Sequence, residues 1–128
     1  MNTKYKIAMG VLVGATLGAA AVQGLHAQAK PKAYIVTESE VIDPAGLAAY
    51  TPIAQAAVRK AGGRSLAPAT TKAVAFVGEA PKRVGISEWE SMEKAQAWRN
   101  SAEWKELAPQ RDKVQKQIRS YAIEGAAN

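Results

Sequence analysis

A short apolar segment at the N-terminus limits how much of this chain can fold into a domain. Two lysines precede an apolar run over residues 7–22, and the segment ends at Ala27-Gln28-Ala29. A basic start, an apolar middle and a small-x-small end are typical of a secretory signal peptide. The run has 16 residues, whereas a retained membrane anchor needs about 20. We therefore expect residues 1–29 to be cleaved and residues 30–128 to form the exported domain.

Cleavage would leave a small domain without thiols or imidazoles. The chain has no cysteine, and its one histidine, His26, lies in the leader. Exported domains of this size are often stabilised by disulfides, so the remaining 99 residues must bury their core through the fold or against a partner subunit. Zinc sites, haem sites and hydrolytic triads normally draw on cysteine, histidine or a paired base. We therefore expect no cofactor and no metal site.

The charge pattern argues against nucleic acid as a partner. After cleavage 15 basic and 11 acidic residues remain, which is a net charge of +4. The two signs are interleaved, as in Glu103, Lys105 and Glu106, and this is typical of a solvated surface rather than of a phosphate-binding stripe. We expect a soluble periplasmic or secreted protein that binds neither nucleic acid nor, once processed, a membrane.

The spacing of apolar residues predicts alternating strands and helices. Residues 33–41 are rich in strand-forming residues, and Asp43-Pro44 then provides the cap and first turn of a helix that Gly62-Gly63 ends. Pro52 is expected to kink this helix or to restart it with Thr51 as a cap. The later expected elements are a broken strand over 64–67 and 73–77, a strand over 83–89, a short helix capped by Ser91, a helix capped by Ser101 that carries Trp104, Leu107, Val114 and Ile118, and a strand over 120–124.

The order of these elements predicts the fold class. The order β-α-β-β-α-β is that of the ferredoxin-like α+β fold, an antiparallel sheet with both helices on one face. The other face of the sheet would have no cover within the chain. In a small domain without disulfides, burial of this face against a second copy is more plausible than exposure. We therefore expect a homodimer.

Several short motifs in this chain resemble those of one family in order and spacing. The motifs are Lys32-Ala33-Tyr34, Asp43-Pro44 with Tyr50, Gly62-Gly63-Arg64, Arg83-Val84, and the runs 88–95, 98–104 and 107–111. With these motifs the chain resembles the domain-of-unknown-function 1330 family within the dimeric α/β-barrel superfamily. The resemblance implies a dimeric α/β barrel and no settled activity. Gly85 and Ser87 stand where this family usually has aliphatic residues, a change that would loosen the strand or reshape a pocket.

Arg111 is the candidate ligand-binding residue that contrasts most with its surroundings. It follows Leu107 by four positions and precedes Val114 by three, so it falls within the apolar stripe of the expected helix. In one interpretation its stem packs there while the guanidinium reaches a carboxylate or carbonyl at the edge. Alternatively, it clamps the carboxylate, phosphate or enolate of a ligand between helices and sheet. Arg64 and Arg83, which each open a strand, allow the same two roles.

Three aromatic residues complete the set of candidates. Tyr50, Trp98 and Trp104 are expected on inward faces, where they either pack in the core or form a wall on which a ligand stacks. No residue is assigned a catalytic role, and the sequence does not decide whether the protein is an enzyme. The expected function is binding of a small anionic or aromatic molecule between helices and sheet. The alternative, by analogy with relatives in the broader superfamily, is a cofactor-independent monooxygenase or isomerase that uses the same cavity.

The first prediction concerns processing of the leader. Protein recovered from the periplasm should begin near Lys30, because the cleavage motif ends at Ala29. Intact-mass measurement checks this directly. A full-length chain in the membrane fraction would contradict it.

Overall fold

The computed structural model of the protein describes residues 30–69 and 71–127. The expected leader, residues 1–29, lies outside this range. The compact domain described below spans Pro31–Ala126. Within the described ranges, no helix has the length and apolar character that crossing a bilayer requires.

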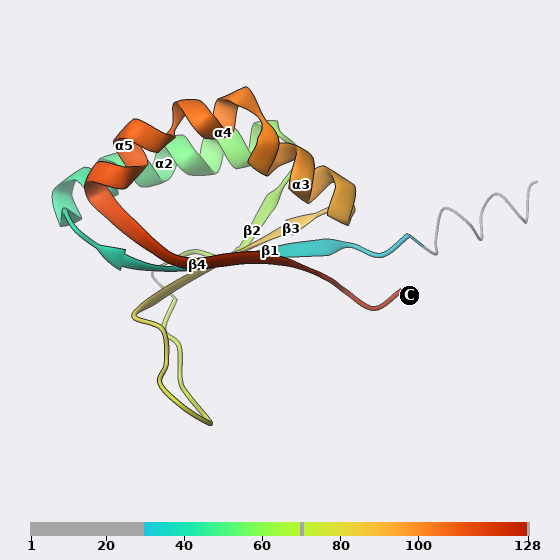
Figure 1. The fold of residues 1–128 in the computed structure, drawn as a ribbon, viewed down its shortest axis with the longest axis horizontal. Helices are drawn as coiled ribbons and strands as arrows, with labels where there is room; N and C mark the ends of the chain where they lie inside the picture. Colours follow the sequence, from blue (N-terminus) through green and yellow to red (C-terminus); the bar gives the residue numbers. More distant parts are fainter. Residues whose placement is uncertain (1–29, 70, 128) are drawn as a thin grey trace, which may run out of the picture. The chain divides into compact units, whose positions relative to one another are not determined.

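A four-stranded antiparallel sheet forms one layer of the fold (Figure 1). Its strands are β1 (Ala33–Val41), β2 (Arg64–Ala67), β3 (Arg83–Trp89) and β4 (Gln115–Glu124), in the order β2-β3-β1-β4. The first strand of the chain is therefore central, and it pairs with both β3 and β4. This order is the ferredoxin-like one, so the predicted α+β class is confirmed.

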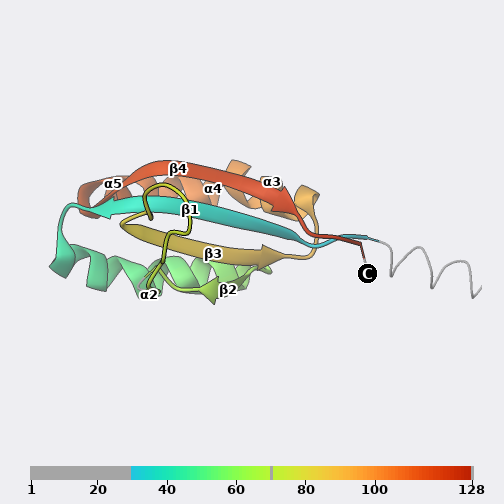
Figure 2. The ribbon, with the colours of Figure 1, turned by 90° about the horizontal axis from the view of Figure 1, so that it is seen from below.

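The helices form the second layer and lie on one face of the sheet (Figures 1 and 2). They are α2 (Pro44–Lys60), α3 (Met92–Asn100), α4 (Ala102–Glu106) and α5 (Ala108–Val114). In Figure 2 the sheet is seen from its other side, with the helices behind it. This second face of the sheet is not covered by any helix of the described chain.

The three expected helix caps are confirmed. The side chains of Asp43, Ser91 and Ser101 each accept a hydrogen bond from the backbone N–H three residues further on, at 3.1, 3.2 and 3.2 Å. Each bond satisfies one of the N–H groups that the first turn of a helix leaves without a partner. At the far end of α2, Gly62 adopts a φ of 97°, which is the conformation in which glycine ends a helix at no steric cost.

The predicted restart of the first helix at Pro52 is wrong. Helix α2 continues through Pro52, although the proline has no N–H for the carbonyl of Ala48. The hydroxyl of Thr51 donates to the carbonyl oxygen of Leu47 at 2.8 Å. The hydroxyl thus bonds back to the preceding turn, as is common for threonine within a helix, and does not cap a new one.

Two other boundaries also differ from the prediction. Residues 73–77 are not a strand. Of the expected broken strand, only Arg64–Ala67 pairs with β3, and Pro68, which follows, has no N–H to continue a ladder. At the C-terminal side, the single helix expected after Ser101 is divided into α4 and α5, and Pro109 lies in the first turn of α5. That helix ends at Val114, so Ile118 belongs to β4.

The core lies between β1, β3 and α3 and is centred on two tryptophans. Its buried residues are Ala33, Ile35, Trp89, Ala95 and Trp98. Trp89, at the end of β3, is 1% exposed, and its ring stacks on that of Trp98 with the centroids 5.9 Å apart. This pair joins the sheet to the helical layer.

The second prediction tests how closely the chain approaches Trp89. A Cβ atom added at Gly63 would lie 2.6 Å from Cζ2 of Trp89 and 2.8 Å from Cγ1 of Val58. Gly63→Ala should therefore lower the free energy of unfolding by about 1–3 kcal/mol through overpacking, as measured by urea denaturation. Gly85→Ala is the matched control, since its nearest new contact is an ordinary 3.7 Å. Equal stability of the two variants would contradict the prediction.

Candidate functional site

A cavity of about 180 Å³ lies between the helices and the sheet. Helix α2 contributes Tyr50 and Val58, and the sheet contributes Ile35, Thr37 and Gly85. The other described residues that line it are Ser39, Thr51, Ala54, Gln55, Ser65, Ala67, Pro68, Ala69, Arg83, Ile86, Ser87, Trp98, Arg99, Trp104, Gln115 and Gln117. Apolar side chains with a few polar groups among them are typical of small-molecule sites.

The volume sets the size of molecule that this cavity can hold. An apolar cavity of about 150 Å³ holds one benzene molecule, and drug-sized ligands occupy about 300 Å³ or more. The cavity therefore has room for a single ring or a short chain with a small polar group. Gly85 contributes to this space because it places no side chain on the inner face of β3.

Arg83 lies at the edge of the cavity and is held by neutral partners. Its Nη1 donates to Oγ of Ser39 at 3.2 Å and to Oε1 of Gln115. Burial lowers the pKa of Arg83, and nearby Tyr50 partly offsets this effect. Since neither bonded partner is a carboxylate, the positive charge of Arg83 is not neutralised by these contacts.

Arg99 is the residue of the site that the sequence analysis missed. Its Nη2 donates to hydroxyl oxygens of Thr37 at 3.0 Å and Ser120 at 2.7 Å, while its buried Nε has no hydrogen-bond partner. Burial and the charge of Arg111 lower the pKa of Arg99 to about 10. The guanidinium is therefore still charged at neutral pH. Its position next to Trp98 in the sequence is no signal for this role, because adjacent residues of a helix do not face the same way.

Arg111 packs on a tryptophan that lines the cavity. Its guanidinium carbon lies 3.9 Å from the ring centroid of Trp104, and that of Arg99 lies 4.1 Å from the same centroid. Both contacts are cation–π interactions. Arg111 Nη1 donates weakly to the carbonyl oxygen of Trp104 at 3.4 Å, and its Nε, 3.5 Å from the exposed carboxylate of Asp112, is buried without a hydrogen bond.

The aromatic candidates surround this group of cations. Tyr50 and Trp98 are buried, and Trp104 meets Trp98 edge-on at 5.8 Å. Burial raises the pKa of the Tyr50 phenol, although the neighbouring charge of Arg111 acts in the opposite direction. The phenol therefore stays protonated at neutral pH and can donate a hydrogen bond into the cavity.

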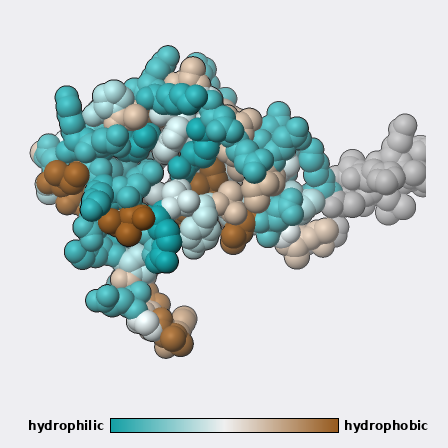
Figure 3. All heavy atoms as spheres, in the orientation of Figure 1, coloured by the Kyte–Doolittle hydropathy of each residue, from teal (hydrophilic) through white to brown (hydrophobic). Residues whose placement is uncertain are grey.

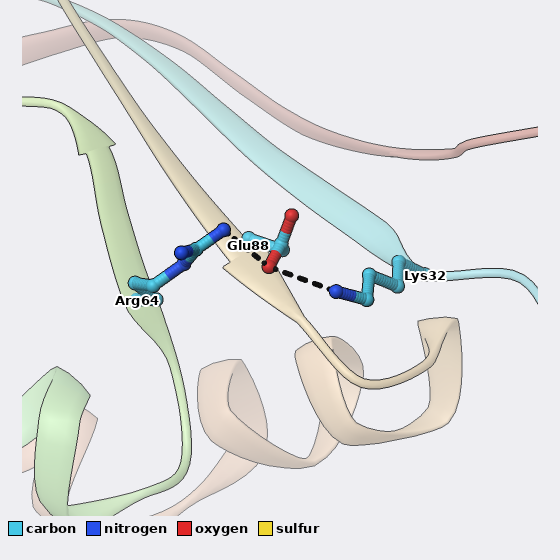
Figure 4. A network of polar contacts seen from close by, with 3 residues as sticks. All are labelled: Lys32, Arg64 and Glu88. Atoms are coloured by element: carbon cyan, nitrogen blue, oxygen red, sulfur yellow. Dashed lines mark hydrogen bonds and ion pairs between the residues drawn. The ribbon is translucent and has the colours of Figure 1, made fainter.

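Arg64 lies apart from the other candidates. It pairs with Glu88 across β2 and β3, and its Nη2 donates to Oε1 of Glu88 at 3.0 Å (Figure 4). Lys32 donates to the same oxygen at 3.3 Å. Partial burial raises the pKa of Glu88, but the bonds and charges of Lys32 and Arg64 outweigh it and hold this pKa below its usual value. Arg64 thus forms an ion-pair network and does not line the cavity.

The electrostatic character of the site follows from these positions. Arg83 and Arg99 line the cavity and Arg111 stacks on its wall, and none of the described lining residues is an aspartate or glutamate. Arg83 and Arg99 have no carboxylate among their hydrogen-bond partners, and Arg111 has only the exposed Asp112 near it, an arrangement that is costly in free energy. An anion in the cavity would accept hydrogen bonds and balance the charge.

The comparisons with known proteins identify the family. Residues 32–126 match the sequence profile of the family described as "Domain of unknown function (DUF1330)". The chain belongs to the DUF1330 family. The resemblance noted from the sequence motifs is thereby confirmed. No curated protein matches this DUF1330 chain.

Two solved structures share the fold of this DUF1330 chain. One is the crystal structure of methylated RPA0582 protein, with a TM-score of 0.54 and 13% identity over 75% of this chain and 82% of that one. The other is the RPA0582 protein of unknown function from Rhodopseudomonas palustris, with a TM-score of 0.53 and 15% identity over 74% and 81% of the two chains. At these identities the likeness establishes the fold alone.

The third prediction separates a structural Arg111 from a ligand-binding one. Arg111→Met should change the free energy of unfolding of the ligand-free protein by less than about 1 kcal/mol. The lost cation–π contact is offset by removal of an unsatisfied buried group and of its repulsion with Arg99. Urea denaturation measures this difference. A loss above about 2 kcal/mol would show that Arg111 braces the fold.

Proposed function

We propose that this DUF1330 protein is an exported homodimer that binds a small carboxylate with an aromatic or apolar body. The observation that supports it best is the cavity lined by Arg83 and Arg99, next to Arg111, without a lining carboxylate among the described residues. A carboxylate suits the planar, multiply donating guanidinium group. The tryptophan rings and the aliphatic side chains provide surface for the apolar body.

The dimer part of this proposal rests on the uncovered face of the sheet. Tyr34 pairs with Ile123 across β1 and β4, and Val36 pairs with Tyr121. Directly paired residues share a face, and because Ile35 between them is buried in the core, these four side chains face away from the helices. Tyr121 and Ile123 are 46% and 50% exposed. Burial of this apolar face against a second copy would remove it from water.

Export remains part of the proposal on the strength of the N-terminal sequence pattern. The basic start, the apolar run and the Ala27-Gln28-Ala29 motif support a cleaved leader. Periplasmic or secreted localisation would follow from its removal.

Proton-transfer chemistry receives less support from the cavity. A cofactor-independent oxygenase or isomerase generally has to accept a proton from its substrate, and a carboxylate or imidazole is the usual base. The lining residues described here include neither, and the Tyr50 phenol, with its raised pKa, is a donor. The geometry therefore favours binding over turnover.

The fourth prediction tests the carboxylate site with benzoate as the first probe in a panel of single-ring carboxylates. In calorimetric titration, binding should be seen for a carboxylate and not for its neutral amide, benzamide. Arg99→Met should weaken that binding by at least about ten-fold, since a charged hydrogen bond contributes about 1.5–3 kcal/mol. Arg59→Met is the matched control, because Arg59 is exposed in the last turn of α2.

Native mass spectrometry of protein recovered from its host completes this test, because it reports a bound ligand and the subunit count together. A ligand-free protein that binds no carboxylate of the panel would overturn the proposed ligand. A monomeric mass at micromolar concentration would overturn the proposed dimer.

A further inference from the structure

The connection between β2 and β3 forms an arm that projects from the domain. We use the word arm for residues 71–82, which contain no helix or strand. Figure 1 shows this segment extending away from the sheet on the side opposite the helices. Figure 2, from below, shows it in front of the uncovered sheet face. The two views agree that the arm and the uncovered face lie on the same side.

The end of the arm is apolar and exposed. Phe76 is 98% exposed and Val77 is 95% exposed, and Val74 is 68% exposed. Figure 3 shows hydrophobic atoms gathered at this tip. A single exposed apolar residue is ordinary, but three of them at the end of a projecting segment mark a surface that is stabilised by contact with something else.

The base of the arm is tied to the sheet on the uncovered side. Lys82 forms an ion pair with Glu40 of β1 at 3.2 Å, and the N–H of Thr71 donates to the carbonyl oxygen of Pro68 at 2.8 Å. Ser39, the neighbour of Glu40, is buried toward the cavity, so alternation places Glu40 on the uncovered face. The Lys82–Glu40 ion pair therefore places the base of the arm on the uncovered side of the sheet.

We infer that the tip of the arm packs on a second copy of this chain that covers the sheet face. This inference rests on the homodimer in the proposed function and adds a residue-level contact to it. Facing sheets lie about 10 Å apart, whereas six extended residues, half of the arm, reach up to about 20 Å. The arm is therefore long enough to pass the edge of the partner's sheet and to place Phe76 against its side.

The sheet face alone is smaller than a typical stable dimer interface. With about 4.8 Å between strands and about 3.3 Å per residue, the four strands, which have four to ten residues each, offer roughly 500 Å² in projection. A stable interface buries about 800 Å² on each partner. The arm is the described segment on this side of the sheet that can supply further apolar contact. By symmetry each copy would receive one arm and provide one.

Charge on the uncovered face does not oppose such a partner. Glu38 is held by Arg119 at 2.6 and 3.2 Å, and Glu88 is held by Lys32 and Arg64. The acidic groups of the face are thus paired within the chain. A lipid surface is less favoured than a second copy, because Lys82 of the arm is already paired with Glu40 and Glu79 offsets Lys72.

The test measures the dimer dissociation constant by sedimentation equilibrium. The sample is the processed protein purified from its host. The double variant Phe76→Ser, Val77→Ser should raise the dissociation constant at least about ten-fold, as expected for loss of a buried aromatic anchor. Its monomer should unfold at the same urea concentration as the unaltered monomer, since both side chains are almost fully exposed there. Lys72→Ser, a polar change in the same arm, is the matched control and should leave the constant unchanged.

The outcomes distinguish the arm from the dimer itself. If the unaltered protein is monomeric at all concentrations, the proposed homodimer fails and the arm inference fails with it. If the protein is dimeric and the double variant has the same dissociation constant, the dimer stands and the arm inference is overturned.

A photo-cross-linker at position 76 gives a second, independent measurement. Replacement of Phe76 by p-benzoylphenylalanine should yield dimer-sized cross-linked products on illumination, and their absence from a dimeric sample would overturn the inference. Flotation with vesicles of phosphatidylcholine and phosphatidylglycerol in a 3:1 ratio addresses the lipid surface. Flotation that is lost in the double variant would likewise overturn it, because the tip would then be a membrane contact.

Discussion

The contact of three tryptophans between the sheet and the helices determines the rest of this structure. Trp89 ends β3, Trp98 lies in α3 and Trp104 in α4, with successive ring centroids 5.9 and 5.8 Å apart. The turn after α2 also packs against the ring of Trp89. The ring lies so close to Gly63 that a Cβ atom would not fit there. In a domain without cysteine, these large rings, two buried and one partly buried, contribute apolar area that holds the two layers together.

The same rings set the electrostatics of the cavity. The face of an aromatic ring attracts a cation, and Trp104 holds the guanidinium groups of Arg99 and Arg111 near its centre. Two like charges are thereby kept close together in a partly desolvated place, which lowers the pKa of Arg99. Aromatic packing alone does not satisfy the N–H groups of these arginines, and each retains a buried Nε without a hydrogen bond. The tryptophan contact therefore places two cations side by side at the wall of the cavity.

The helix caps and the strand starts could be predicted from the sequence, because each depends on residues close to it in the chain. The caps at Asp43 and Ser91 and the strand-opening positions of Arg64 and Arg83 are set by neighbouring residues, and all agree with the structure. Ile118 was misassigned because its spacing from Val114 also fits a helix, whereas its neighbours Gln117 and Arg119 pair with β1.

The candidate site was predictable only in part, because its members come from separate elements. Tyr50, Arg83, Trp98 and Trp104 do line one cavity. Arg64, which has the same sequence context as Arg83, turns to Glu88 instead. The role of Arg99 depends on a ring five positions away and on hydroxyls of two strands, a combination that no pattern along the chain reports.

The place of β4 in the sheet also governs when this fold can form. Strand β1 is the first element of the domain, yet one of its two neighbours is the last ten residues of regular structure, Gln115–Glu124. A ribosome makes the N-terminal part first, and pairings between distant segments must wait for chain closure. The central strand thus has an unpaired edge until residues 115–124 have been synthesised. This topology therefore prolongs the interval in which the domain is only partly folded.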